Sequence, residues 1–212
     1  MNLLARLLYG IVDLGYVQAA DAPRVMEQML EGGVDLVQLR AKKRPRDEVG
    51  ALAQQLQPLA TAAGVPFILN DDPQLAARLG LDGVHVGQDD LSVAEARRLL
   101  GPGKIVGQST HSLEQARAAL DEPPDYIGFG PLFATPTKPD YTPIGMADLR
   151  RAHAQVPLPI YCIGGIKREN LDVVLAAGER RVVIVSGILK APDIRAYCRE
   201  VKERLVRNAR GE

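Results

Sequence analysis

Two aspartates and three cationic side chains could together hold a divalent metal and a phosphorylated ligand. Asp71 and Asp90 each follow an apolar run, and Mg2+ is commonly held by one or two carboxylates together with phosphate oxygens. Each aspartate also stands just before a predicted helix, where aspartate often caps the first turn. Capping is the better interpretation of either aspartate alone. Because Arg40, Lys42 and Lys138 accompany them, we favour a Mg2+ site beside a diphosphate.

A short cationic segment lies at the end of the second apolar run. Gln38 and Arg40 are two residues apart and share one face of an extended strand, and Lys42 follows at its end. An inward-pointing arginine is costly to bury unless it meets an anion. A structural pair with a carboxylate is the alternative, and it is the better interpretation of Arg40 alone. With the aspartates, the pattern predicts an anion-binding site.

The segment Thr135-Pro136-Thr137-Lys138 falls in the longest predicted connection of the chain. Long connections in compact domains tend to be functional. The hydroxyls and the ammonium suit a phosphate-bearing ligand, and the length suits a lid. The alternative is a solvated, proline-rich loop.

The last two apolar runs end in small residues. Gly164 and Gly165 follow one run, and Val185, Ser186 and Gly187 end the other. Barrel proteins commonly bind a phosphate at these two places through backbone N–H groups. Simple tight turns are the alternative, and we favour phosphate binding.

The three histidines carry different expectations. His85 lies within an apolar run and is expected to be a hydrogen-bonded structural group, whereas His111 follows a strand and is the better candidate for chemistry. His153 lies in a predicted helix without a catalytic neighbour, and we expect it on the surface. The sequence shows no His–Asp–Ser or Cys–His arrangement at matched strand ends, so covalent hydrolase chemistry is poorly supported.

One strand–helix unit repeats along the chain and would position these side chains. The predicted strands are Leu7–Asp13, Leu36–Arg40, Phe67–Asn70, Gly83–Gly87, Ile105–Ser109, Tyr126–Pro131, Ile160–Gly165 and Val182–Gly187. The predicted helices are Ala22–Glu31, Arg46–Ala63, Pro73–Leu79, Val93–Leu100, Leu113–Leu120, Met146–His153, Arg168–Ala176 and Pro192–Arg207. Continuous apolar strands indicate burial on both faces, as in parallel sheets covered by helices.

Eight such units predict an α/β fold, a closed (β/α)8 TIM barrel that forms a single domain over residues 1–212. A doubly wound open sheet is the alternative. Polar residues follow nearly every predicted strand, whereas strand starts such as Leu36 and Ile160 are apolar. In a barrel these ends meet at one mouth, where barrel enzymes carry their active sites.

Composition excludes several classes of function. The chain has 26 basic and 26 acidic residues, which gives no long-range attraction for nucleic acid or an anionic membrane. Cys162 and Cys198 show neither zinc-ligand spacing nor a disulfide framework, so we expect a cytoplasmic protein. No apolar stretch approaches the length of about 18 residues that suggests a membrane span. The apolar segment Met1–Tyr9 is interpreted as leading into the first strand, not as a signal peptide.

Several segments, taken in order, resemble the signatures of the thiamine-phosphate synthase family. Gln38-Leu39-Arg40-Ala41-Lys42 matches Q-L-R-x-K, Asn70-Asp71 matches N-D, and residues 83–90 are similar to G-V-H-x-G-Q-x-D. Residues 107–112 are similar to G-x-S-T-H-S and residues 125–138 to D-Y-I-G-x-G-P…T-x-T-K, and Ile163-Gly164-Gly165-Ile166 and Val185-Ser186 complete the series. The approach to the eighth strand differs, since Glu179-Arg180-Arg181 stands where the family usually has small residues, and Tyr161-Cys162 replaces more aliphatic residues.

The resemblance implies a transferase of thiamine biosynthesis. Such an enzyme moves the 4-amino-2-methylpyrimidin-5-ylmethyl group from its diphosphate to a thiazole phosphate, with Mg2+, and gives thiamine phosphate. In the family the diphosphate leaves first, and the thiazole nitrogen captures the resulting cation. The resemblance implies that Asp71 and Asp90 hold Mg2+ and that the catalytic residues are Arg40, Lys42, Ser109 and Lys138. The implied substrate-binding residues are Gln38, Leu39, Arg40, Ala41, Lys42, Asn70, Ser109, Thr135, Pro136, Thr137, Lys138, Gly165, Val185 and Ser186.

Two other functions fit the same barrel. A thiazole tautomerase would move a proton with His111, but an isomerase has no use for a diphosphate-binding cluster. A non-catalytic binder of thiazole or thiamine phosphates would bind without releasing diphosphate. A sugar-phosphate epimerase is less consistent with the sequence, because it would need paired metal-binding histidines and aspartates.

Overall fold

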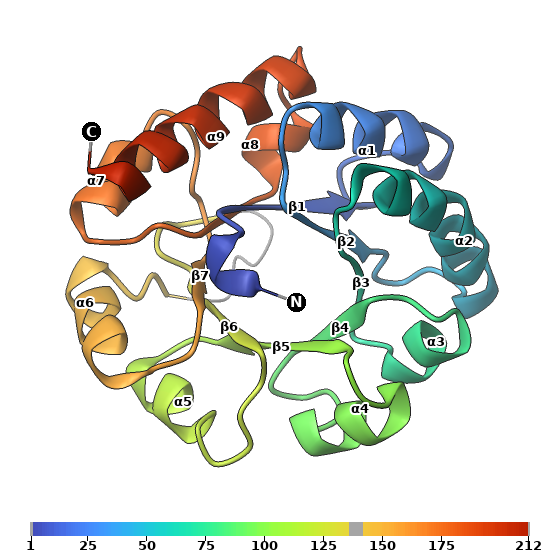
Figure 1. The fold of residues 1–212 in the computed structure, drawn as a ribbon, viewed down its shortest axis with the longest axis horizontal. Helices are drawn as coiled ribbons and strands as arrows, with labels where there is room; N and C mark the ends of the chain where they lie inside the picture. The colour runs from blue at the N-terminus through green and yellow to red at the C-terminus, as the bar shows by residue number, and fades with distance from the viewer. Residues whose placement is uncertain (1, 136–141, 212) are drawn as a thin grey trace.

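The computed structural model describes residues 2–135 and 142–211, and within them eight strands close into one barrel in the order β1 to β8. All neighbouring strands are parallel, and β8 returns to pair with β1. Helices surround the barrel on its outside (Figure 1). The predicted (β/α)8 barrel is confirmed, and the open-sheet alternative is wrong.

The elements follow the predicted alternation. The strands are β1 Leu8–Asp13, β2 Leu36–Arg40, β3 Phe67–Asn70, β4 Gly83–Val86, β5 Ile105–Thr110, β6 Tyr126–Phe129, β7 Ile160–Cys162 and β8 Val182–Ile184. The α-helices are α1 Ala22–Glu31, α2 Arg46–Ala63, α3 Pro73–Arg78, α4 Val93–Leu100, α5 Leu113–Ala118, α6 Met146–Gln155, α7 Leu171–Ala176, α8 Ser186–Leu189 and α9 Ile194–Arg210. Two 3-10 helices, η1 Leu3–Ala5 and η2 Ala19–Asp21, flank β1.

Side chains alternate along each strand between the barrel interior and the surrounding helices. In β1, Tyr9 belongs to a small inner cluster and Leu8 to a much larger outer core. The inner cluster also contains Tyr126, Tyr161 and Leu3 of η1, and Figure 1 shows η1 lying over one end of the barrel. Because this end is filled, a ligand would enter the barrel from the carboxyl ends of the strands.

The last two strands end earlier than the sequence predicts. β7 ends at Cys162, and Gly164 and Gly165 follow with φ angles of 95° and 66°, a left-handed backbone that cannot continue a strand. β8 ends at Ile184, and Ser186–Leu189 forms α8, which periodicity alone does not reveal. Short extra helices after the eighth strand are common at the phosphate sites of barrels.

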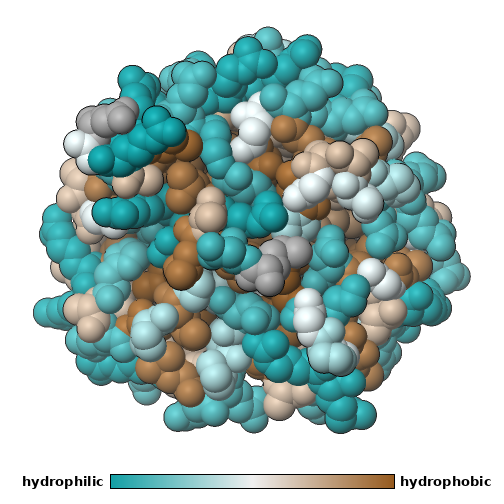
Figure 2. All heavy atoms as spheres, viewed as in Figure 1, coloured by the Kyte–Doolittle hydropathy of each residue, from teal (hydrophilic) through white to brown (hydrophobic). Residues whose placement is uncertain are grey.

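The outer surface is mostly hydrophilic on the face that carries η1 (Figure 2). Among the described residues, the large hydrophobic side chains that are well exposed are Leu4 and Val173. No helix in the described part of the chain combines the length and apolarity needed to cross a bilayer.

Candidate active site

A pocket opens at the carboxyl ends of the strands and encloses about 880 Å3 together with the solvent at its mouth. The sequence-predicted residues that line it are Gln38, Arg40, Asn70, Ser109, Thr135, Gly165, Val185 and Ser186. Lining residues with no role assigned from the sequence include Tyr9, Ile11 and Asp13. The barrel therefore brings residues from both halves of the chain to one cavity.

Arg40 enters this pocket at the end of β2 and pairs with Asp13 at the end of β1. The Nη1 atom of Arg40 lies 2.8 Å from Oδ2 of Asp13, because the two residues are partners in the strand register. Asp13 is almost fully buried, and its other oxygen accepts the N–H of Gly15 at 2.9 Å. A guanidinium has five N–H groups, so Arg40 keeps further donors for a ligand.

Lys42, Asp71 and Asp90 form one cluster at the mouth of the barrel. The ammonium of Lys42 pairs with Asp71, and Asp90 lies near enough to Asp71 to influence its pKa. Burial raises the pKa of Asp71, and Asp90 raises it further, against the opposing influence of Lys42. Two neighbouring carboxylates need a proton or a cation between them to relieve their repulsion.

Neither aspartate caps the helix that follows it. Asp72 is the N-cap of α3, and Ser92 forms a capping box at the start of α4. Asp90 instead accepts the N–H of Gly87 at 2.6 Å, and Asp71 has a φ of 67°. The capping interpretation is wrong, and a left-handed non-glycine residue is the kind of strain that clusters at functional sites.

A series of buried polar contacts crosses the pocket floor from Gln38 to Ser109. The Nε2 atom of Gln38 lies 2.5 Å from Oη of Tyr9, which lies 3.1 Å from Oη of Tyr126. His85 follows, with Nδ1 at 2.9 Å from Oη of Tyr126 and Nε2 at 2.9 Å from Oγ of Ser109. His85 is hydrogen-bonded, as the sequence predicts. The two tyrosines were not singled out from the sequence, where their only signal is an apolar position within a strand.

The opposite side of the pocket is formed by tight backbone after β7 and β8. Val185 and Ser186 line it together with Gly164 and Gly165. A Cβ on Gly164 would lie 2.3 Å from Cα of Pro131, and one on Gly165 would lie 2.7 Å from the carbonyl oxygen of Ala134. Both positions therefore need glycine for close packing as well as for their positive φ angles.

The remaining predicted residues lie apart from this pocket or outside the described residues. Leu39 is buried in the outer core, on the helix side of β2. Ala41 lines a second opening with Lys42 and Asp71, and Asn70 lines both openings. Pro136, Thr137 and Lys138 lie outside the described residues.

His111 lines the pocket, and its Nδ1 atom lies 2.7 Å from the carbonyl oxygen of Gly130. His111 therefore lies at the mouth of the barrel, and a chemical role for it stays a prediction.

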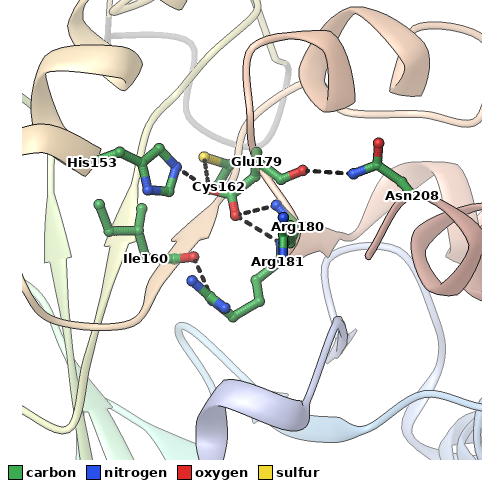
Figure 3. A network of polar contacts seen from close by, with 7 residues as sticks. All are labelled: His153, Ile160, Cys162, Glu179, Arg180, Arg181 and Asn208. Carbon is green, nitrogen blue, oxygen red and sulfur yellow. Dashed lines mark hydrogen bonds and ion pairs between the residues drawn. The ribbon is translucent and has the colours of Figure 1, made fainter. Parts of the chain in front are cut away.

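A second polar network lies outside the barrel, at the approach to β8 (Figure 3). Glu179 is fully buried, and its Oε1 atom accepts the backbone N–H groups of Arg180 at 2.6 Å and Arg181 at 2.7 Å. Its Oε2 atom accepts the thiol of Cys162 at 2.8 Å and lies 3.1 Å from Nε2 of His153. The surface position expected for His153 is wrong, because the helix face that carries it packs over this carboxylate and leaves its side chain 29% exposed.

Comparisons with known proteins relate this chain to one family. A family model described as thiamine monophosphate synthase matches residues 8–188. A thiamine-phosphate synthase of Thermus thermophilus is 50% identical over 180 residues, 84% of this chain and 86% of the relative. One of Shouchella clausii is 43% identical over 190 residues, 89% and 91% of the two chains. The solved structure of a thiamine phosphate pyrophosphorylase from Pyrococcus furiosus has a TM-score of 0.86 and 29% identity, and the match covers 95% of this chain and 96% of that one.

Proposed function

The chain belongs to the thiamine monophosphate synthase family and is a transferase that forms thiamine phosphate, and we propose that it does so by the route described below. The 4-amino-2-methylpyrimidin-5-ylmethyl group leaves its diphosphate, and the nitrogen of a thiazole phosphate captures it. The observation that carries this proposal is the pairing of Lys42 with Asp71 at the mouth of the barrel, with Asp90 nearby.

The leaving diphosphate would bind at this cluster. Asp71 and Asp90 would hold Mg2+, which neutralises phosphate charge when bound. Burial, and then the neighbouring Asp90, raise the pKa of Asp71, and a bound cation would relieve the repulsion between the two carboxylates. No three His, Cys, Asp or Glu side chains in the described ranges form a metal group by themselves. Such a two-carboxylate site suits Mg2+, which takes further ligands from substrate phosphates and water.

The cations of this chain would stabilise charge as the diphosphate departs. Lys42 lies against Asp71, and Arg40 is held at the adjacent strand end by Asp13. Lys138, on a segment outside the described residues, is proposed to join them. Pre-placed charges of this kind lower the barrier because they need no reorganisation during the reaction.

The thiazole phosphate would bind on the other side of the pocket. Gly165, Val185 and Ser186 line that side, and Thr135, Pro136 and Thr137 are proposed to bind the same phosphate. Two separate anchors would align the two reactants, which is a large part of catalysis when no nucleophilic residue takes part. Ser109 and Gln38 would hold the pyrimidine at the floor.

Purified chain mixed with Mg2+ and both substrates tests the proposal directly. We expect equal amounts of diphosphate and thiamine phosphate, and we expect no turnover when a chelator removes the metal. A non-catalytic binder would bind a thiazole phosphate without releasing diphosphate. That outcome would overturn the proposed function.

The thiazole tautomerase alternative is not favoured, because the relatives named above are synthases. His111→Ala separates the two functions, since a tautomerase would lose nearly all activity while the synthase keeps its diphosphate-binding cluster. We also propose a cytoplasmic location, which the two buried free cysteines support.

A further inference from the structure

The contacts from Gln38 to Ser109 form a relay, a chain of hydrogen bonds in which each group between the two ends accepts from one neighbour and donates to the next. The Nε2 group of Gln38 can only donate, so Tyr9 accepts from it. The hydroxyl of Tyr9 then donates to the hydroxyl of Tyr126, because the described residues offer this buried hydroxyl no other acceptor. The donor and acceptor roles of the other groups follow from this first hydrogen bond.

The same reasoning fixes the tautomer of His85. Tyr126 accepts from Tyr9 and donates its own proton to Nδ1 of His85. A neutral imidazole that accepts at Nδ1 carries its proton on Nε2, and this proton faces Oγ of Ser109. The hydroxyl proton of Ser109 is therefore not used by His85 and is left for the pocket, which Ser109 lines.

The hydrogen bonds could also run in the opposite order, from Ser109 to Gln38. That order requires the side-chain amide of Gln38 to be rotated so that its oxygen faces Tyr9. Ser109 would then donate to His85, and Tyr9 would donate to the amide oxygen of Gln38. The two directions present opposite patterns to a ligand. With Nε2 of Gln38 facing Tyr9, the amide oxygen of Gln38 is left for a ligand, and Ser109 offers a proton.

The strand register and two glycines make room for this relay. His85, Gly107 and Tyr126 are partners on three successive strands, so the side chains of His85 and Tyr126 meet across Gly107. A Cβ on Gly107 would lie 2.1 Å from Cζ of Tyr126, and one on Gly128 would lie 3.3 Å from Cε1 of His85. Burial raises the pKa of both relay tyrosines, so each keeps the proton that it passes on.

We propose that Tyr9, Tyr126 and His85 are positioning residues that make Gln38 a hydrogen-bond acceptor and Ser109 a donor, so that the pocket selects an aminopyrimidine over its deaminated counterpart. An aminopyrimidine donates from its amino group and accepts at its ring nitrogens. The 4-oxo counterpart accepts at its oxygen and carries a proton on a ring nitrogen, which reverses the pattern. The inference rests on the proposed function for the identity of the substrate.

The tautomer of His85 is measured without any substrate. Two-bond 1H–15N correlation spectra at about pH 8, where an ordinary histidine is neutral, distinguish the two tautomers. The chain has three histidines, so the His85 signals are assigned from the spectrum of His85→Asn. We expect a proton on Nε2. A proton on Nδ1, or on both nitrogens, would overturn the proposal even if the chain proves to be an active synthase.

The selectivity is measured as the ratio of kcat/KM for the aminopyrimidine diphosphate and its 4-oxo analogue. Tyr9→Phe frees the Gln38 amide to turn over, and Tyr126→Phe frees His85 to change tautomer. Either variant should lower the ratio about tenfold or more, the usual scale for a buried hydrogen bond that fixes recognition. Tyr161→Phe is the matched control, since its hydroxyl contacts the carbonyl oxygens of Leu3 and Arg6 and lies outside the relay.

The control separates recognition from folding. Loss of selectivity in Tyr9→Phe and Tyr126→Phe, with the ratio of Tyr161→Phe unchanged, supports the proposal. An unchanged ratio in the two relay variants, or an equal loss in all three, would refute it. If a relay variant does not fold, the tautomer of the unaltered chain decides.

Discussion

Replacing Glu179 by alanine should destabilise the barrel strongly, because its carboxylate is the common acceptor of the network in Figure 3. Alanine would leave the N–H groups of Arg180 and Arg181 and the thiol of Cys162 without this acceptor. Each unmade bond costs about 1–3 kcal/mol when buried, and the two N–H groups are only partly buried, which favours the lower figure. We expect a loss of about 3 kcal/mol in the free energy of unfolding, about 1 kcal/mol for each of the three unmade bonds.

The assay is urea unfolding, with thermal unfolding as a check. For a chain of this size the expected loss corresponds to a fall in Tm of about 6–12 °C. Glu179→Gln keeps one oxygen as an acceptor and should cost about 1–2 kcal/mol. Glu169→Ala is the control, since that carboxylate is 63% exposed in its pair with Arg168 and should change stability by less than about 0.5 kcal/mol.

The position of this network explains why the whole barrel should lose stability in Glu179→Ala. Among the described residues, β7 and β8 pair through Cys162 and Val182 alone, so Glu179 adds bonds where the strand ladder is shortest. If Glu179→Ala is no less stable than Glu169→Ala, the buried carboxylate does not hold this junction, and the reasoning is wrong.

Three further predictions concern the site and the cysteines. Asp71→Asn and Asp90→Asn should each abolish Mg2+-dependent diphosphate release while the unfolding midpoint stays near that of the unaltered chain; full activity in both variants would remove the metal assignment. Lys42→Ala should lower kcat on the order of a hundredfold, because leaving-group stabilisation belongs to the transition state, and a rise in KM alone would contradict that role. Burial raises the pKa of Cys198 to about 12 and that of Cys162 well above its usual value. At about pH 8 a thiol reagent should therefore modify both cysteines only after the chain unfolds. Rapid labelling of the folded chain would contradict this prediction.

The sequence predicts the barrel well because its signal is repeated and local. Each apolar run is a buried strand, and most predicted bounds agree with the structure within a few residues. The error at the end of β8 has a local cause that periodicity does not capture, since Val185 leaves the strand and α8 begins at Ser186. Apolar residues such as Ile188 and Leu189 suit a buried strand and a short buried helix equally well.

The site was predictable where charged residues follow strands, and not where buried residues meet across the barrel. The proximity of Lys42 to Asp71 follows from neighbouring strand ends, whereas capping by Asp71 fails because the next residue, Asp72, takes that position. Tyr9 and Tyr126 are 117 residues apart in sequence. Their contact depends on the closed barrel and on the register that aligns Gly107 between strands, neither of which a single segment encodes.

Arg40 shows that a structural and a functional interpretation need not compete. Its pair with Asp13 is the structural pair that the sequence left open, yet Asp13 is almost fully buried and uses its other oxygen on Gly15. A buried carboxylate held in this way fixes the position of the guanidinium in the pocket lining before any ligand arrives, so little side-chain entropy is lost when an anion binds. Arg40 lines the main pocket together with Asn70, and Asn70 also lines the second opening with Lys42 and Asp71. The same ion pair that braces β1 against β2 therefore pre-positions one of the charges proposed to receive the diphosphate.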